Sequence, residues 1–153
     1  MKRALAFLLL AAGLLPRAHA AGSCSLSLTS SQLVDFGTYT SAGPAIEGSG
    51  ALSFLCVPDI LSGLTVPYSI SIGAGGSGSF GTRRLSAGGY WLNYNLYTSA
   101  ARNVIWGDGT AGTSKVNGSC ATLCTVQVFG RLPAGQSVPG AQYSDSVVVT
   151  IDF

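Results

Sequence analysis

The chain has 153 residues, of which 9% are charged and 47% are hydrophobic, and its formal net charge is +2. This length suits one domain with a single core. Gly, Ser, Thr, Ala and Val are abundant, whereas Lys and Glu are almost absent after residue 20, a composition that favours β-strands joined by glycine-rich turns and disfavours helices.

Residues 1–20 have the pattern of a secretory signal peptide. Lys2 and Arg3 precede an apolar run from Ala4 to Leu15, and a small-x-small cleavage site follows at Ala18-His19-Ala20. The apolar run is too short to span a bilayer stably, and no later segment reaches about 18 apolar residues. We therefore expect an exported chain without an integral membrane segment, whose mature domain covers residues 21–153.

Loss of the signal peptide changes the charge and the available chemistry. Five basic groups then face six acidic groups, so the net charge moves from +2 to −1. The basic character thus gives no argument for a nucleic acid or an anionic membrane as partner. His19, the only histidine, leaves with the signal, and without it a Ser-His-Asp or Cys-His catalytic arrangement is impossible. We expect a protein that is not an enzyme and holds no cofactor or metal.

Short runs of alternating apolar and polar residues recur between segments rich in Gly and Pro. They predict strands at 24–29, 52–56, 68–72, 91–97 and 126–128, and a closing strand at 143–153. The glycine-rich segment 73–81 predicts a loop, and residues 99–103 form one turn at most. The pattern predicts an all-β fold, an antiparallel β-sandwich.

Four cysteines remain in the mature chain, and an even number in an exported protein predicts two disulfides. Three pairings are compatible with the sequence. Cys24 and Cys56 each lie on an apolar strand face, which favours a bridge between neighbouring strands and leaves Cys120 to pair with Cys124. The competing interpretation is a zinc site with all four cysteines as ligands, but Cys24 and Cys56 do not form a second knuckle.

The aromatic residues between 90 and 106 offer a candidate binding surface. We expect most of them to fill the core, with Tyr94 on the same face as its leucine neighbours. Trp91 and Tyr97 point to the opposite face and, with Trp106, are candidates for an exposed site that stacks on sugar rings or lies on an apolar surface. Asp108, within WGDGT at 106–110, is interpreted as part of a tight turn because the other ligands of a calcium loop are missing.

The closing segment YSDSVVVTIDF has the strongest strand pattern in the chain. Its apolar residues fall mainly on one side of an extended chain: Tyr143, Val147, Val149, Ile151 and Phe153. Asp145 and Asp152 lie on opposite faces of such a strand, so they are not a paired acid and base.

The segments taken together resemble the spore coat protein U domain family, which includes subunits of archaic chaperone–usher pili. The resemblance covers essentially the whole mature chain. It rests on the order of CSLSL at 24–28, VDFGTY at 34–39, YNLYTSA at 94–100, WGDGTAG at 106–112 and FGRLPAGQSVPGAQYSDSVVVTIDF at 129–153. It implies an incomplete immunoglobulin-like sandwich that lacks its final strand. The first two cysteines also match the usual disulfide position of that family.

The resemblance also implies a mode of assembly. A periplasmic chaperone supplies the missing strand, and an outer-membrane usher exchanges it for the N-terminal extension of another subunit, which places the protein first in the periplasm and then in a pilus at the cell surface. The physical basis is strand addition at an exposed edge, with alternate apolar side chains entering a groove. The carried-over groove consists of the first strand and the closing strand, through Leu26, Leu28, Val147, Val149, Ile151 and Phe153.

The chain departs from the donating subunits of that family at its mature N-terminus. A donor strand needs on the order of ten residues before the first cysteine, and only Ala21, Gly22 and Ser23 precede Cys24 after signal cleavage. We therefore expect a subunit that accepts a strand but donates none, at the adhesive tip of the fibre. Two alternatives stay open: a free-standing secreted module that binds carbohydrate, and a structural protein of a spore coat or cell surface.

Overall fold

The computed structural model describes residues 22–27, 33–58 and 65–153; the expected signal peptide lies outside them. Two antiparallel sheets form the fold. The strands are β1 (Gly22–Ser27), β2 (Ile46–Pro58), β3 (Val66–Ile72), β4 (Arg83–Ala87), β5 (Tyr90–Tyr97), β6 (Val116–Cys120), β7 (Leu123–Leu132) and β8 (Val149–Asp152), with a short 3-10 turn η1 (Gly75–Ser77).

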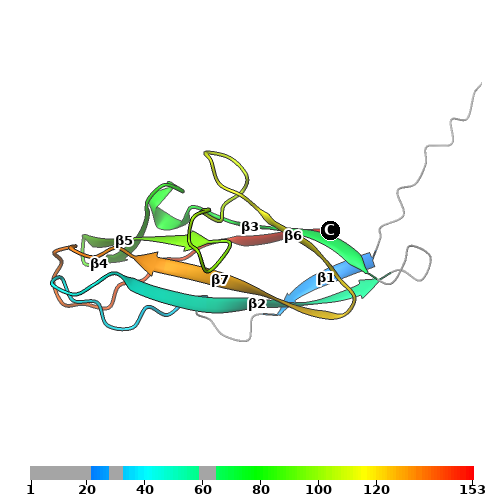
Figure 1. Cartoon of the computed structure of the whole chain (residues 1–153), viewed down its shortest axis with the longest axis horizontal. Coiled ribbons are helices and arrows are strands. Elements are labelled where there is room, and N and C mark those ends of the chain that lie inside the picture. The colour runs from blue at the N-terminus through cyan, green and yellow to red at the C-terminus, as the bar shows by residue number, and fades with distance from the viewer. Residues whose placement is uncertain (1–21, 28–32, 59–64) are drawn as a thin grey trace, which may run out of the picture.

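One sheet has five strands in the order β1-β2-β7-β5-β4, and the other has three in the order β6-β3-β8. Figure 1 shows the two layers facing each other, with the β4–β5 hairpin at one end of the molecule and β1, β6 and the C-terminus toward the other. The all-β antiparallel sandwich expected from the sequence is confirmed. Every ladder is antiparallel, as expected when short strands are joined by tight turns.

The core follows the alternation of the sequence. In β2, the inward residues Leu52, Phe54 and Cys56 are buried, and their neighbours in the strand are more exposed. The same alternation buries the following residues from the other strands: Ile70, Ile72, Leu92, Tyr94, Leu96, Val128 and Leu132. The expected placement of Tyr94 in the core is therefore confirmed.

The alternation in the sequence did not predict two of the strands, β4 and β6. In β4, the inward position beside Leu85 is taken by Arg83, a charged residue that is nevertheless fully buried, so the apolar alternation is interrupted. In β6, Asn117, Gly118 and Ser119 are exposed on a sheet edge, where no burial constrains them to be apolar.

Both disulfides form as the sequence favoured. Cys24 and Cys56 lie directly opposite each other in the β1–β2 ladder. Cys120 and Cys124 join the end of β6 to the start of β7, and therefore link the two sheets at a corner. All four sulfurs are consumed in this way, which rules out the zinc alternative.

One candidate for an exposed aromatic site is wrong. Trp106 is fully buried between the sheets, and its Nε1 donates a hydrogen bond to the Ile70 carbonyl oxygen at 2.9 Å. A large aromatic ring with a satisfied indole N–H is stable in a core. Asp108, two residues later, accepts hydrogen bonds from both the backbone and the hydroxyl of Thr110, which is the tight turn expected from the sequence; these bonds lower the pKa of its carboxyl group.

Candidate functional site

A groove of about 1100 Å³ opens at the end of the sandwich where the β4–β5 hairpin lies. Its two sides are extended segments: residues 33–41, the first wall, and residues 138–149, the second wall. In Figure 1 these cyan and orange-to-red segments gather at the same end of the molecule. The floor is apolar and consists of Leu52, Leu85, Leu92, Leu96 and Leu132 with the ring of Tyr94.

The first wall lies on the inner face of the five-stranded sheet because glycines leave room for it. A Cβ built at Gly50 would overlap the Leu33 carbonyl oxygen, and one at Gly130 would come within 2.6 Å of the Phe36 ring. Gly48 and Gly130 are direct partners in the β2–β7 ladder, so the two form one flat patch under Phe36. The missing side chains of the sheet thus define the path of the wall.

The second wall passes from one sheet to the other. Ser144 exchanges two backbone hydrogen bonds with Ser86 of β4, at 2.8 and 3.2 Å, and four residues later Val148 accepts one from Gly73. The chain then joins β3 as strand β8. The closing strand expected over 143–153 is therefore regular only at Val149–Asp152, while its alternation of burial continues through the irregular part.

Both walls make few backbone–backbone hydrogen bonds in the described part of the chain. Within the described residues, the first wall makes no backbone hydrogen bond except the turn in which Gly43 donates to Thr40. The second wall leaves residues 138–143 and 145–147 without backbone partners in the same part of the chain, and β8 is paired only with β3. Side chains bond three of these groups, the Gly37 and Ser146 N–H groups and the Pro139 carbonyl. The other N–H and C=O groups of the walls, beside an apolar floor, are the features of an open strand position.

A polar network lies at the side of the floor. The Tyr94 hydroxyl donates to Asp145 Oδ2 at 2.7 Å, and Asp145 Oδ1 accepts from the backbone N–H groups of Gly76 and Ser146, each at 2.9 Å. Burial and the bond to Asp145 raise the pKa of Tyr94, so the phenol stays protonated. Phe36 of the first wall packs edge-on against the same ring, with 5.9 Å between ring centroids.

The buried Arg83 lies next to this network and makes its own set of hydrogen bonds. It donates to the carbonyl oxygens of Ile72, Gly73 and Trp106 and to Asn95 Oδ1, at 2.6 to 3.2 Å. Burial lowers its pKa, while the nearby Tyr94 and Asp145 counteract that shift. Because these bonds satisfy its guanidinium group, the charge is tolerated in the core and fixes β3, β4 and β5 relative to one another.

One end of the groove is closed by a hydrogen bond between segments far apart in sequence. The backbone N–H of Gln136 donates to the Tyr39 hydroxyl at 2.7 Å. The side chain of Gln136 replaces a strand residue: its Oε1 accepts from the Asn93 N–H at 2.6 Å, and its Nε2 donates to the Asn93 carbonyl at 3.0 Å. β7 pairs β5 only at Asn95–Tyr97, so this side-chain amide covers the edge of β5 that β7 does not reach.

The closing-strand residues named from the sequence divide into two groups. Val147 and Val149 line the groove from the second wall. Ile151 lies opposite Ile70 in the β3–β8 ladder and Phe153 is 57% exposed, and neither lines the groove.

The first-strand residues named with them are Leu26 and Leu28. Leu26 is paired with Phe54 in the β1–β2 ladder, and Leu28 lies outside the described residues. Sequence reasoning missed that residues 33–41 form the opposite wall, because VDFGTY at 34–39 lacks a long alternating pattern. The glycines of β2 and β7 were the available signal.

The two other aromatic candidates, Trp91 and Tyr97, differ in exposure. Trp91 is 56% exposed and lies beside Arg84, whose guanidinium carbon is 5.7 Å from the ring centroid. Tyr97 is partly buried. Both belong to β5, on the face that points away from the core, as their alternation with the buried Leu92, Tyr94 and Leu96 shows.

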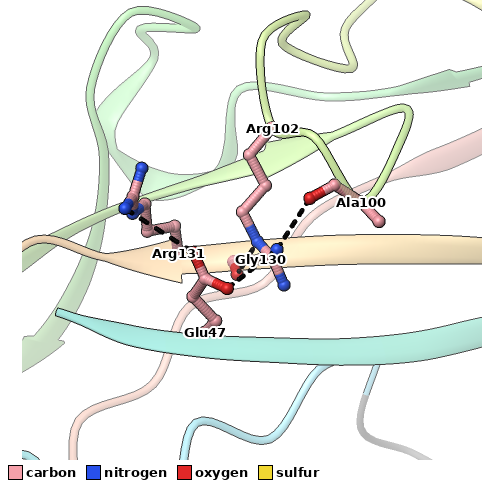
Figure 2. Close-up of polar contacts among 5 residues, drawn as sticks. All are labelled: Glu47, Ala100, Arg102, Gly130 and Arg131. Carbon is pink, nitrogen blue, oxygen red and sulfur yellow. Dashed lines mark hydrogen bonds and ion pairs between the residues drawn. The ribbon is translucent and has the colours of Figure 1, made fainter.

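A charged cluster on the outer side of the five-stranded sheet holds the loop after β5. Arg102 Nε donates to the Gly130 carbonyl at 3.1 Å, and Nη1 contacts both the Ala100 carbonyl and Glu47. Figure 2 shows Glu47 between Arg102 and Arg131, with the loop folded over β7. Because its charges are paired within the chain, we interpret this cluster as structural.

Two other site types receive no support in the described part of the chain. No group of three or more His, Cys, Asp or Glu side chains is placed to hold a metal ion. No described helix has the length and apolar character needed to cross a membrane.

Comparison with known proteins gives two kinds of likeness. The family model for the Spore Coat Protein U domain matches residues 10–150. Protein U of Myxococcus xanthus is 32% identical over 145 residues, which are 89% of this chain and 80% of that protein.

Among solved structures, the chaperone–tip adhesion subunit pre-assembly complex CsuC–CsuE, from archaic chaperone-usher Csu pili of Acinetobacter baumannii, matches with a TM-score of 0.56 and 21% identity. That match covers 86% of this chain but 40% of the solved chain. A chaperone–tip adhesin complex of CFA/I fimbriae matches with a TM-score of 0.47 and 16% identity, over 85% of this chain and 40% of that one.

The first structural likeness shows a shared fold, the immunoglobulin-like sandwich expected from the sequence. The family match, which extends over nearly the whole chain, agrees with the relative in Myxococcus xanthus. The chain therefore belongs to the Spore Coat Protein U domain family.

Proposed function

We propose that this protein is a non-enzymatic subunit of a chaperone–usher surface pilus, and that its groove accepts an extended strand from another polypeptide. The observation that carries the proposal is the pair of walls whose backbone groups are unpaired on either side of an apolar floor. An inserted strand would pair with one or both walls and bury alternate side chains on the leucines.

The energetics favour such a partner over a small molecule. A strand between the walls offers a row of backbone donors and acceptors, and each net hydrogen bond contributes about 0.5–1.5 kcal/mol. Apolar side chains that enter the groove add about 25 cal/mol per Å² of surface removed from water. Left uncovered, the same edge would favour aggregation. The groove therefore suits a strand with alternating apolar residues.

We propose partners that would cover the open groove at each stage of assembly. A periplasmic chaperone protects the groove after export, an outer-membrane usher assembles the fibre, and a neighbouring subunit supplies the final strand. The likeness in fold to a chain of the chaperone–tip adhesion subunit complex of Csu pili supports this assignment. The protein would then pass through the periplasm and reside in a pilus at the cell surface.

The test compares two adjacent valines. Val147 lines the groove, whereas Val148 is 73% exposed and points away from it. The exported chain is purified alone, with a candidate chaperone, and with alternating Val/Thr donor peptides, and its monomer yield and melting temperature are measured. Addition of chaperone or peptide should raise both. Val147→Asp should abolish the gain and Val148→Asp should retain it; a well-folded monomer that ignores every strand would refute the proposal.

The finer part of the proposal is a position at the fibre tip. It is supported by β1, which uses Gly22–Ser27 in its own sheet, and by the signal cleavage that the sequence predicts after Ala20. N-terminal sequencing of the exported protein tests that cleavage, and cross-linking in assembled fibres tests donation. A residue of this chain found inserted in another subunit would refute the tip position.

The exposure of Trp91 beside Arg84 supports a second candidate function, adhesion or carbohydrate binding through the β4–β5 face. Trp91→Ala should then reduce binding to glycans or abiotic surfaces without changing the response to donor peptides. If binding is lost only when the groove is filled, the surface function is wrong.

A further inference from the structure

We infer that Tyr39 and Gln136 form an end-stop that sets how far an inserted strand can extend along the groove. The inference rests on the proposed strand-accepting function and assigns a specificity role to a contact between the first wall and the segment that leads into the second wall. The contact is the 2.7 Å hydrogen bond from the Gln136 N–H to the Tyr39 hydroxyl.

The geometry leaves no strand-sized passage at this point. Paired strands lie about 4.8 Å apart, so a strand flanked on both sides needs roughly 9.6 Å between the backbones of the walls. At Tyr39 the phenol ring fills that space and reaches Gln136 directly. A strand that enters the groove from the side of Val147 and Val149 therefore ends before this ring.

Gln136 is itself held in place, which makes the stop rigid. Besides its two bonds to the Asn93 backbone, its Nε2 donates to the Pro133 carbonyl at 3.1 Å. Gly135, with φ +76°, supplies the turn that brings Gln136 back beside β5. Tyr39 is partly buried and packs against the core. Movement of the stop thus requires loss of several bonds, so strand length and register become part of partner selection.

The experiment measures affinity against peptide length. Alternating Val/Thr peptides of roughly six to twelve residues, lengthened in steps of two at either end, compete with a labelled peptide for the full exported chain. In the natural protein the affinity should rise and then level off, with less than about twofold gain from the last step. In Tyr39→Ala, which removes the ring, the next step should still gain about fivefold, the ratio for one net backbone hydrogen bond of about 1 kcal/mol.

Tyr143→Ala is the matched control. Tyr143 also lines the groove, but its hydroxyl donates to the Pro139 carbonyl within the second wall, at 3.0 Å, and joins no other segment. This variant should level off at the natural length. Tyr39→Phe, which loses the hydroxyl but keeps the ring, should level off near the natural length.

A measurement on the natural protein makes the conclusion independent of the variants. Peptides with a photo-reactive residue at one terminus or the other are cross-linked and analysed by mass spectrometry. One terminus should attach to residues 37–41 or 138–140. Attachment beyond them, or equal length dependence in the natural protein and Tyr39→Ala, overturns the end-stop but leaves the strand-accepting function intact. Absence of binding by all peptides overturns both.

Discussion

Replacement of Gly50 by alanine should displace the first wall and impair the groove without touching a groove-lining residue of β8. The added Cβ would overlap the Leu33 carbonyl oxygen. Because this oxygen belongs to the backbone, it cannot move aside by a change of side-chain rotamer. Separation to an ordinary contact of about 3.4 Å requires a shift of more than about 1.5 Å in the wall, and overpacking of this kind costs about 1–3 kcal/mol. The packing of Phe36 on Gly130 and Tyr94 is lost with it.

The expected loss for Gly50→Ala is therefore about 2 kcal/mol, or a drop of roughly 5–8 °C in melting temperature for a domain of this size. Urea unfolding in the presence of saturating donor peptide, followed by tryptophan fluorescence, measures it. Gly140→Ala is the control, because a Cβ there meets nothing within 4 Å, and it should stay within about 0.5 kcal/mol. Donor-peptide affinity should fall only in Gly50→Ala. Equal behaviour of the two variants would refute the argument that glycine sets the path of the wall.

Three further predictions concern stability. Replacement of the Cys24–Cys56 bridge by two serines should lower the free energy of unfolding by about 4 kcal/mol, and the same change at the bridge between β6 and β7 should lower it by about 2 kcal/mol. The difference arises because the two bridges close loops with sequence separations of 32 and 4 residues. Urea titrations without reductant measure both losses, and the reverse order would contradict the loop argument. Because the pKa of Tyr94 is raised in the folded state, its contribution to stability is fully present below the unfolded-state pKa of about 10. Above that pH the free energy of unfolding should fall by up to about 1.4 kcal/mol per pH unit. In Tyr94→Phe this alkaline slope should disappear, and its persistence would exclude Tyr94 as the cause. Gln136→Leu should lower the free energy of unfolding by about 1–3 kcal/mol because the backbone N–H and carbonyl of Asn93 both lose their partner. Hydrogen exchange should accelerate first at the Asn93 N–H. Unchanged protection there would show that β5 does not depend on the Gln136 side chain.

The closing segment illustrates how much of the site can be read from the sequence. Its alternation placed Val147 and Val149 on an inward face, and the structure puts both in the second wall. It could not show that the chain bridges to Ser86 of β4 before it joins β3, because the period of a strand specifies which face is buried but not which neighbour pairs with it.

The first wall shows the opposite case. Residues 33–41 carry few periodic apolar residues, and their position is fixed by absent side chains on Gly48, Gly50 and Gly130. A glycine in sequence signals conformational freedom or close approach without naming what approaches. The prediction that Trp106 is exposed was wrong for a related reason. An aromatic residue in a loop-like motif is expected at the surface, and the sequence does not show that the Ile70 carbonyl of β3 accepts its indole N–H.

The sequence by itself determined the β-sandwich, the pairing partners that the cysteines favour, the inward faces of most strands and the resemblance to a family, because these depend on local alternation, on composition and on segment order. Only the tertiary structure decided which segments bound the groove and where the hydroxyl of Tyr39 meets Gln136. Those features depend on contacts between residues up to 97 positions apart, and on backbone groups left unpaired, neither of which leaves a periodic mark on the sequence. The buried charge of Arg83 is a further such feature, because its burial is tolerated only where carbonyl oxygens from separate segments of the chain accept hydrogen bonds from it.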